Sequence, residues 1–190
     1  MRASRDCGFQ GVWILGCAVA VFVLLTPVEA AEMRGSLRSL LAAYRCEVVN
    51  RLERIYQRGN PAASDRDRFI AITVREHPHG YVQCIFYEHR LSMLCEASSG
   101  FHFDKPGAPR TFRLAPEAVA ALGVLGFSTD DSQGNLRREF DVDSPPDFNR
   151  IADFMLTALH DGYGARADSA LKFNAPFARR GGTTCLRVVD

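Results

Sequence analysis

Apolar residues recur at steps of three and four along residues 36–58, which is the spacing of one helix face. Ser36 is suited to cap the start of such a helix, and Gly59 is suited to end it. We therefore expect an amphipathic helix over residues 36–58, with turn-forming residues at 59–67 after it. The apolar face consists of Leu37, Leu41, Tyr44, Val48, Leu52 and Ile55.

Three segments after this helix have the composition of β-strands, because β-branched and aromatic residues lie between turns rich in Gly and Pro. A tight turn at His89 and Arg90 would pair the second and third strands. Cys84 and Cys95 each lie five positions from that turn, so they would face each other on one side of the hairpin. Neighbours at this distance can form a disulfide bond. The three segments are residues 69–75, 81–87 and 91–97.

A short helix and a fourth strand are predicted in the second half of the chain. Residues 115–125 contain Pro116, which suits the first turn of a helix. Residues 128–135 form a polar loop. Residues 136–142 then alternate between apolar and charged side chains, as an exposed strand does.

A third helix is predicted near the C-terminus. The sequence Ser144-Pro-Pro-Asp147 has the form of a capping box, with a proline at the first helical position. The helix after it runs to about Asp161, and the tail carries a short strand signal at residues 185–189. The predicted order of elements is therefore α-β-β-β-α-β-α.

The N-terminal residues have the layout of a secretory signal peptide. Two arginines precede the apolar run at residues 11–25, and a small-residue cleavage site follows. We predict cleavage between Ala30 and Ala31, so that residues 1–30 are a signal peptide. The mature protein is then periplasmic or secreted.

Two alternatives to a cleaved signal peptide follow from the same segment. An uncleaved membrane anchor is disfavoured because the apolar run is shorter than the roughly 20 residues of a spanning helix. Lipidation at Cys17 is disfavoured because the apolar run continues past this cysteine and Leu15 is bulky for the position it would occupy.

The mature chain is balanced in charge and long enough for one domain. Removal of the signal peptide leaves 160 residues (190 minus 30), which can bury a proper core. The four charges of the signal cancel, so the net charge stays at +1. This balance indicates neither a nucleic-acid partner nor a membrane surface once the signal is removed.

Four cysteines remain after cleavage, and an even number in an exported protein favours disulfide bonds. Three connectivities are open, and four unpaired buried thiols are the alternative. If the hairpin joins Cys84 to Cys95, then Cys46 pairs with Cys185 and ties the tail to the first helix.

Several motifs occur in a fixed order along the chain: Tyr81-Val-Gln83, Leu91 through Cys95-Glu-Ala-Ser-Ser-Gly100, Leu122 to Gly126-Phe127, Gly134-Asn135, Arg138-Glu139-Phe140 and the Ile151-to-Tyr163 helix. Together they resemble the TY-Chap superfamily, which unites type III secretion chaperones with YbjN-like proteins. The resemblance covers about residues 36–177, and it rests on order and spacing because no single motif is diagnostic.

This resemblance implies an α+β fold, a single-domain α/β sandwich with helices packed on an antiparallel sheet. The domain would span residues 31–178, with a C-terminal tail at 179–190. The family also implies binding of an unknown peptide or protein client, frequent homodimers and no catalysis. By this analogy, Phe154, Met155 and Leu159 could line a peptide groove. A stripe of this kind is more often core packed against a sheet.

The predicted export conflicts with one role of the family. Type III secretion chaperones work in the cytoplasm, where they deliver effectors, and an exported chain cannot do so. We therefore expect an exported, non-enzymatic, chaperone-like protein that binds a peptide or protein segment. The alternatives are a small periplasmic enzyme or metal-binding protein and a structural envelope component.

The histidines are the main candidates for metal chemistry. His77 and His79 flank a proline in a turn, and His89 and His102 lie nearby in the sequence. No spacing typical of metal ligands joins them, so surface turn histidines are the simpler interpretation. The chain has no Gly-x-Ser-x-Gly nucleophile elbow and no phosphate loop. We name no catalytic, cofactor or metal residue.

We predict that peptide mapping of the exported, unreduced protein finds an N-terminus at Ala31 and links Cys84 to Cys95 and Cys46 to Cys185. Disulfide bonds form and persist in an oxidising compartment, and preparation without reductant leaves them intact. A link from Cys46 to either hairpin cysteine would contradict the predicted connectivity.

Overall fold

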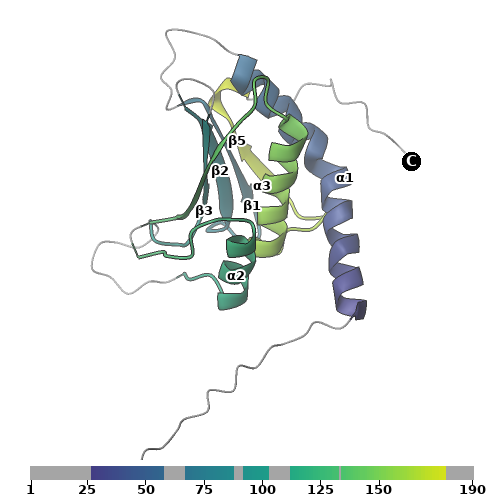
Figure 1. Cartoon of the computed structure of the whole chain (residues 1–190). Helices are drawn as coiled ribbons and strands as arrows, with labels where there is room; N and C mark the ends of the chain where they lie inside the picture. Colours follow the sequence, from purple (N-terminus) through teal and green to yellow (C-terminus); the bar gives the residue numbers. More distant parts are fainter. Residues whose placement is uncertain (1–26, 58–66, 88–91, 103–111, 133, 179–190) are drawn as a thin grey trace, which may run out of the picture.

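The fold consists of helices packed against one antiparallel sheet (Figure 1). It is given by a computed structural model that describes residues 27–57, 67–87, 92–102, 112–132 and 134–178. The helices are α1 (Pro27–Gln57), α2 (Pro116–Val124) and α3 (Phe148–Tyr163), with a short 3-10 turn at Pro176–Ala178. The strands are β1 (Phe69–Val74), β2 (Tyr81–Phe86), β3 (Ser92–Ala97), β4 (Leu136–Asp141) and β5 (Leu171–Asn174).

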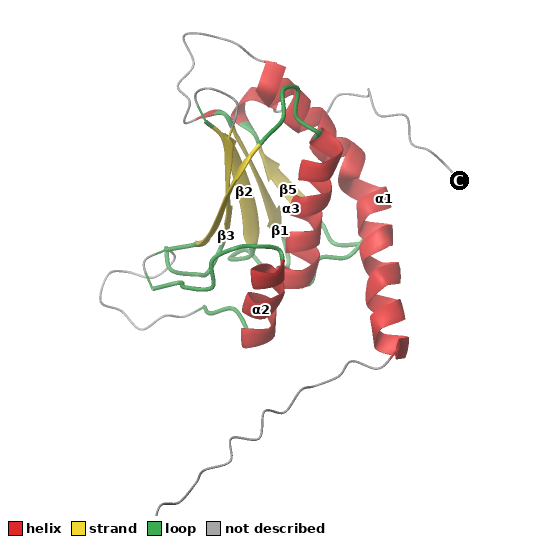
Figure 2. Ribbon diagram, viewed as in Figure 1, coloured by secondary structure: helices red, strands yellow, loops and turns green. Residues whose placement is uncertain are grey.

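The sheet has the strand order β4-β3-β2-β1-β5, and each neighbouring pair is antiparallel. Figure 2 shows α1 and α3 on one side of the sheet, with no described helix on its other face. This arrangement confirms the predicted α+β class and the antiparallel sheet. It also makes β4 and β5 the two edge strands.

The core lies between the sheet and the helices because side chains alternate along each central strand. Every second residue of β1, β2 and β3 is fully or almost fully buried, and the residues between them are only partly buried. One stripe each of α1 and α3 packs against the buried face. Large, fully buried members of this core are Leu40, Leu52, Ile55, Ile70, Ile72, Phe86, Met93, Met155, Leu156 and Leu159.

The predicted hairpin disulfide is present. Cys84 pairs with Cys95 in the β2–β3 register, and the two sulfur atoms are bonded. Ser98 donates its amide hydrogen to the carbonyl of Tyr81, so hydrogen-bonded pairs alternate from there and the cysteines form a non-hydrogen-bonded pair. Such pairs have the closest side chains, and the Cα–Cα distance is 4.1 Å. The strand register therefore explains the bond.

The second predicted bond remains a prediction. Cys46 lies on α1, where its sulfur accepts a hydrogen bond of 3.7 Å from Asn50 Nδ2. Cys185 lies outside the described residues, as does the strand predicted at residues 185–189.

Both long helices begin at a different residue from the one predicted. Helix α1 starts at Pro27 rather than Ser36, because the intervening residues contain alanines and no internal proline. The cleavage site between Ala30 and Ala31 therefore lies inside its first turns, and cleavage itself remains a prediction. In α3 the N-cap is Asp147, whose side chain accepts from the Arg150 amide. With Ser144 as the cap, Pro145 would be the first helical residue, and Pro146 disfavours helical geometry there.

Strand β5 was not predicted from the sequence. Contacts with Arg51 hold this strand and the turn after it against α1. The Arg51 guanidinium donates to the carbonyl of Ala178 at 2.5 Å, and it lies 4.8 Å from the ring centre of Phe173. Glu47 pairs with the same guanidinium. Because Arg51 is almost fully buried, these contacts satisfy its charge and hold the last described residues on the helix layer.

The C-terminal end of α3 is fixed by Tyr163. Its hydroxyl donates to the carbonyl of Ser98 at 2.7 Å, and its ring packs so closely on Gly80 that a Cβ there would lie 2.7 Å away. Burial raises the pKa of Tyr163 far above its ordinary value. Gly164 then ends the helix in a left-handed conformation. This end of the helix is therefore held against the start of β2 and the end of β3.

None of the described helices is both long and apolar enough to cross a membrane.

We predict that replacing both hairpin cysteines, Cys84→Ala with Cys95→Ala, lowers the free energy of unfolding by about 3 kcal/mol. The bond closes a loop with a sequence separation of 11 residues, and its loss frees the unfolded chain. Urea denaturation of the oxidised protein and the double variant measures the difference. Equal midpoints and slopes would show that the bond contributes nothing to stability.

Candidate functional site

A pocket of about 270 Å³ opens between the edge strand β4 and helix α3. We call it the β4–α3 pocket. Strand β4 forms one side, the first turns of α3 form the other, and the segment joining them closes one end. Its floor is apolar and its rim is charged. It is lined by Arg138, Phe140, Asp141, Val142, Asp143, Asp147, Arg150, Ile151 and Phe154.

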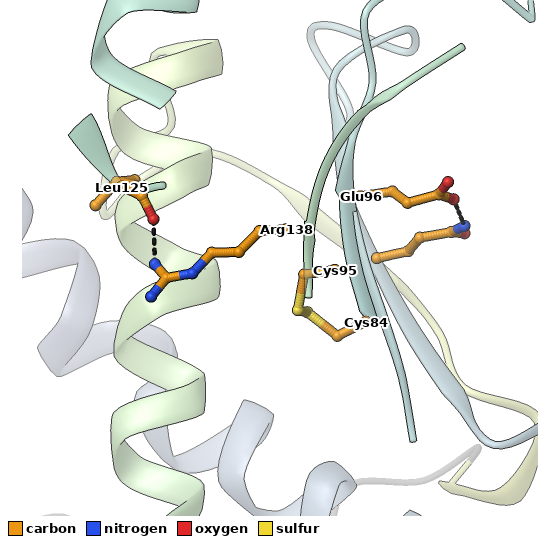
Figure 3. The surroundings of a disulfide bond; sticks show 6 residues. Cys84, Cys95, Glu96, Leu125 and Arg138 are labelled. Carbon is orange, nitrogen blue, oxygen red and sulfur yellow. Dashed lines mark hydrogen bonds between the residues drawn. A yellow bond between two sulfur atoms is a disulfide. The ribbon is translucent and has the colours of Figure 1, made fainter. Parts of the chain in front are cut away.

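Arg138 forms the inner wall of the pocket and joins three elements. Its guanidinium reaches from β4 to donate to the backbone carbonyl of Leu125, just after α2 (Figure 3). The same group lies 4.8 Å from the ring centre of Phe154 on α3 and 5.2 Å from that of Phe140 on β4. Planar stacking and a hydrogen bond together hold an arginine firmly in place. This wall of the pocket is therefore preorganised.

Aromatic rings form the apolar floor. Phe154 stacks on Phe127 with ring centres 5.2 Å apart, and it meets Phe140 edge to face at 5.6 Å. Phe127 is buried, whereas the other two rings are partly exposed in the pocket. Offset and edge-to-face pairs of this kind add to the stability of buried aromatic clusters. The pocket can therefore accept an apolar side chain without rearranging its floor.

The backbone of β4 is capped over part of its outer edge. Ser128 donates its amide hydrogen to the Arg137 carbonyl at 2.7 Å, and its hydroxyl accepts from the Arg137 amide at 2.9 Å. The polar backbone groups of Arg137 therefore point away from β3. Along a strand, the backbone N–H and C=O groups of successive residues point to opposite sides. The backbone groups of Glu139 and Asp141 therefore also point away from β3.

The rest of that edge is open. Within the described part of the chain, no residue hydrogen-bonds to the outward backbone groups of Glu139 or Asp141. Both side chains are exposed and acidic. We call Glu139–Asp141 the free edge of β4. An unpaired edge offers a ladder of donors and acceptors to another extended chain.

The side chains around the pocket differ in how far their charges are satisfied. Arg137 is 61% exposed and pairs with Glu96 at 2.9 Å on the opposite face of the sheet. Asp141 and Asp143 form no ion pair with a described residue. The strand end nearest α3 is therefore negative and exposed.

The residues predicted to line a groove are only partly found there. Phe154 lines the β4–α3 pocket, and its role in binding a peptide stays a prediction. Met155 and Leu159 have no exposed surface, so for them the groove assignment is wrong and they belong to the core. The reason is helical geometry, because the stripe that contains both residues faces the sheet.

The histidines lie apart from this pocket. His79 packs 5.5 Å from the ring of Phe112, and His102 packs edge to face on Phe101. His89 lies outside the described residues. Among the residues that are described, no group of three His, Cys, Asp or Glu side chains could hold a metal ion.

The wall and rim residues were missed at the sequence level. The alternation of residues 136–142 correctly identified an exposed strand, but it could not identify α3 as the neighbour of that strand. Arg138 carried the one available signal, because it is a charged residue on the same face as Leu136 and Phe140. A charge on the inner face of a strand indicates a specific partner.

A comparison with known families finds one match. Residues 44–177 match the family model TY-Chap3, described as "T3SS (YopN, CesT) and YbjN peptide-binding chaperone 3". The chain belongs to the TY-Chap3 family. The match covers α2, α3, all five strands and the C-terminal part of α1 from residue 44 on, so it includes every residue of the β4–α3 pocket.

The superfamily resemblance inferred from motif order is thereby confirmed. By its description the TY-Chap3 family consists of peptide-binding chaperones. No curated protein and no solved structure matches the chain.

We predict that Arg138→Met lowers the free energy of unfolding of this TY-Chap3 protein by about 2 kcal/mol. The change keeps the apolar stem but removes a charged hydrogen bond and two ring contacts. Arg137→Met is the matched control, because the side chain it removes is mostly exposed and Glu96 keeps its hydrogen bond from Gln83, so we expect a loss below about 1 kcal/mol. Urea denaturation measures both variants, and equal losses would contradict a clamping role for Arg138.

Proposed function

We propose that this protein is an exported chaperone-like binder that holds an extended client segment along the free edge of β4. The segment adds to the sheet as a sixth strand beside β4, and one of its side chains enters the β4–α3 pocket. The observation that carries this proposal is the placement of unpaired backbone groups at Glu139 and Asp141 next to that apolar pocket.

The two features fit one ligand because strand geometry links them. Backbone hydrogen bonds at an edge supply affinity without reading sequence, whereas pockets for alternate side chains supply selectivity. A chaperone-like binder needs affinity for many segments, and weak selectivity among them is sufficient. The membership in a family of peptide-binding chaperones supports the same assignment.

Export is the second part of the proposal. It rests on the signal-like N-terminus and on the bond between Cys84 and Cys95, since such bonds persist in oxidising compartments. An exported chain would meet clients in the periplasm or outside the cell. A second copy of the chain is an alternative occupant of the same edge.

We predict that Glu139→Pro weakens peptide binding by roughly tenfold, whereas Glu139→Ala changes it by less than about threefold. Proline removes the outward amide but leaves the ladder to β3 intact, because residue 139 does not bond to that strand. Heptapeptides selected from a random phage library supply the probes, and fluorescence polarisation gives their affinities.

Circular dichroism melts of both variants check that the fold is retained. Selected peptides that bind Glu139→Pro as tightly as the wild type would contradict edge pairing. Failure to select any peptide would contradict the proposed function itself.

A further inference from the structure

We propose that the free edge selects segments in which a basic residue stands two positions before an apolar residue, in the N-to-C direction. This inference rests on the proposed function and names the class of client segment. It follows from the register that the edge permits, the apolar floor of the pocket and the unpaired carboxylates at one end.

The register is limited on one side. Ser128 occupies the outward backbone groups of Arg137, so an added strand cannot pair beyond that residue. It must lie opposite Glu139 and the residues that follow. Pairing at Glu139 and Asp141 leaves Phe140 between two hydrogen-bonded pairs, where opposite side chains come closest.

The residue opposite Phe140 faces an apolar site. It lies on the helix side of the sheet, where the rings of Phe140 and Phe154 form the floor. The charge of Arg138 at this point is already engaged by Leu125 and by both rings. An aromatic or large aliphatic side chain therefore fits here better than a charged one.

The next helix-side position of the added strand is opposite Val142. Asp141, Asp143 and Asp147 line this end of the pocket, and Arg150 is the one cation among the lining residues there. The Asp147 side chain accepts from the Arg150 amide, and Asp143 is exposed without an ion-pair partner in the described chain. This excess of carboxylates favours a lysine or arginine.

The direction follows from the sheet. Every pair of neighbouring strands is antiparallel, and β4 would keep that pattern with an added strand. The client then passes Val142 before it reaches Phe140. A basic residue therefore precedes the apolar residue by two positions, and the outward-facing acidic side chains of Glu139 and Asp141 also repel acidic neighbours.

Fluorescence polarisation with three labelled threonine-rich peptides tests this inference. They contain Lys-Thr-Phe, Glu-Thr-Phe or the reversed order Phe-Thr-Lys. We expect the first to bind roughly fivefold more tightly than either of the others. Asp143→Lys should remove or reverse the preference between the lysine and glutamate peptides. Asp168→Lys, at an exposed position before β5, is the matched control and should leave it unchanged.

Each other outcome has a definite meaning. Equal affinity for all three peptides would overturn the inference and leave the proposed function standing. Tighter binding of the reversed peptide would overturn the antiparallel register. If the selected heptapeptides bind but none of the three designed peptides does, the motif is wrong. If neither set binds, the proposed function also fails.

Light scattering at the assay concentration tests whether a second copy of the chain occupies the free edge. A dimer that becomes monomeric in Glu139→Pro would show that a second copy fills the edge, and it would overturn the inference.

Discussion

The contact of Arg138 with Leu125, Phe140 and Phe154 is the interaction on which the candidate site depends. It connects the end of α2, the edge strand and α3 through one side chain. A lysine in this position could not hydrogen-bond Leu125 and lie over both rings with the same delocalised group. The same connection brings the segment after α2 beside β4, where Ser128 caps the outward groups of Arg137. Arg138 therefore shapes the pocket and also holds the segment that contains Ser128. Ser128 in turn determines how much of the β4 edge stays unpaired.

The disulfide stabilises the strands behind this edge. Cys95 is directly opposite Arg138 in the β3–β4 register and is bonded to Cys84 on β2. Both cysteines are fully buried beneath the helix layer, so reductants reach them only when the protein opens. Such burial is typical of a structural disulfide and not of a redox switch. A sheet fastened in this way can accept an extra strand with little rearrangement, which lowers the entropic cost of binding.

Local pattern predicted most elements, and tertiary contacts determined the rest. The hairpin of β2 and β3 was predictable because turn position and strand alternation together define which residues face each other. Strand β5 was not, because its alternation extends over only four residues and ends shortly before Pro176. The capping of α3 moved from Ser144 to Asp147 because two prolines intervene. Met155 and Leu159 belong to the core, which is the more common place for such a stripe, and only the family analogy had suggested a groove. No local pattern could have paired Arg138 with Leu125, since that contact forms only when α2 and β4 are already in place.

The two edges of the sheet differ in a way that bears on function. The β5 edge is followed by a turn that Arg51 fastens to α1, and its inward face is covered by that helix. The β4 edge has a pocket beside it, and it keeps a short unpaired stretch with acidic side chains. Natural proteins protect exposed edges with charges because an open edge invites aggregation. Glu139 and Asp141 therefore serve two requirements at once. They discourage edge pairing between copies, which carry the same charges, and they admit a segment that brings the opposite charge.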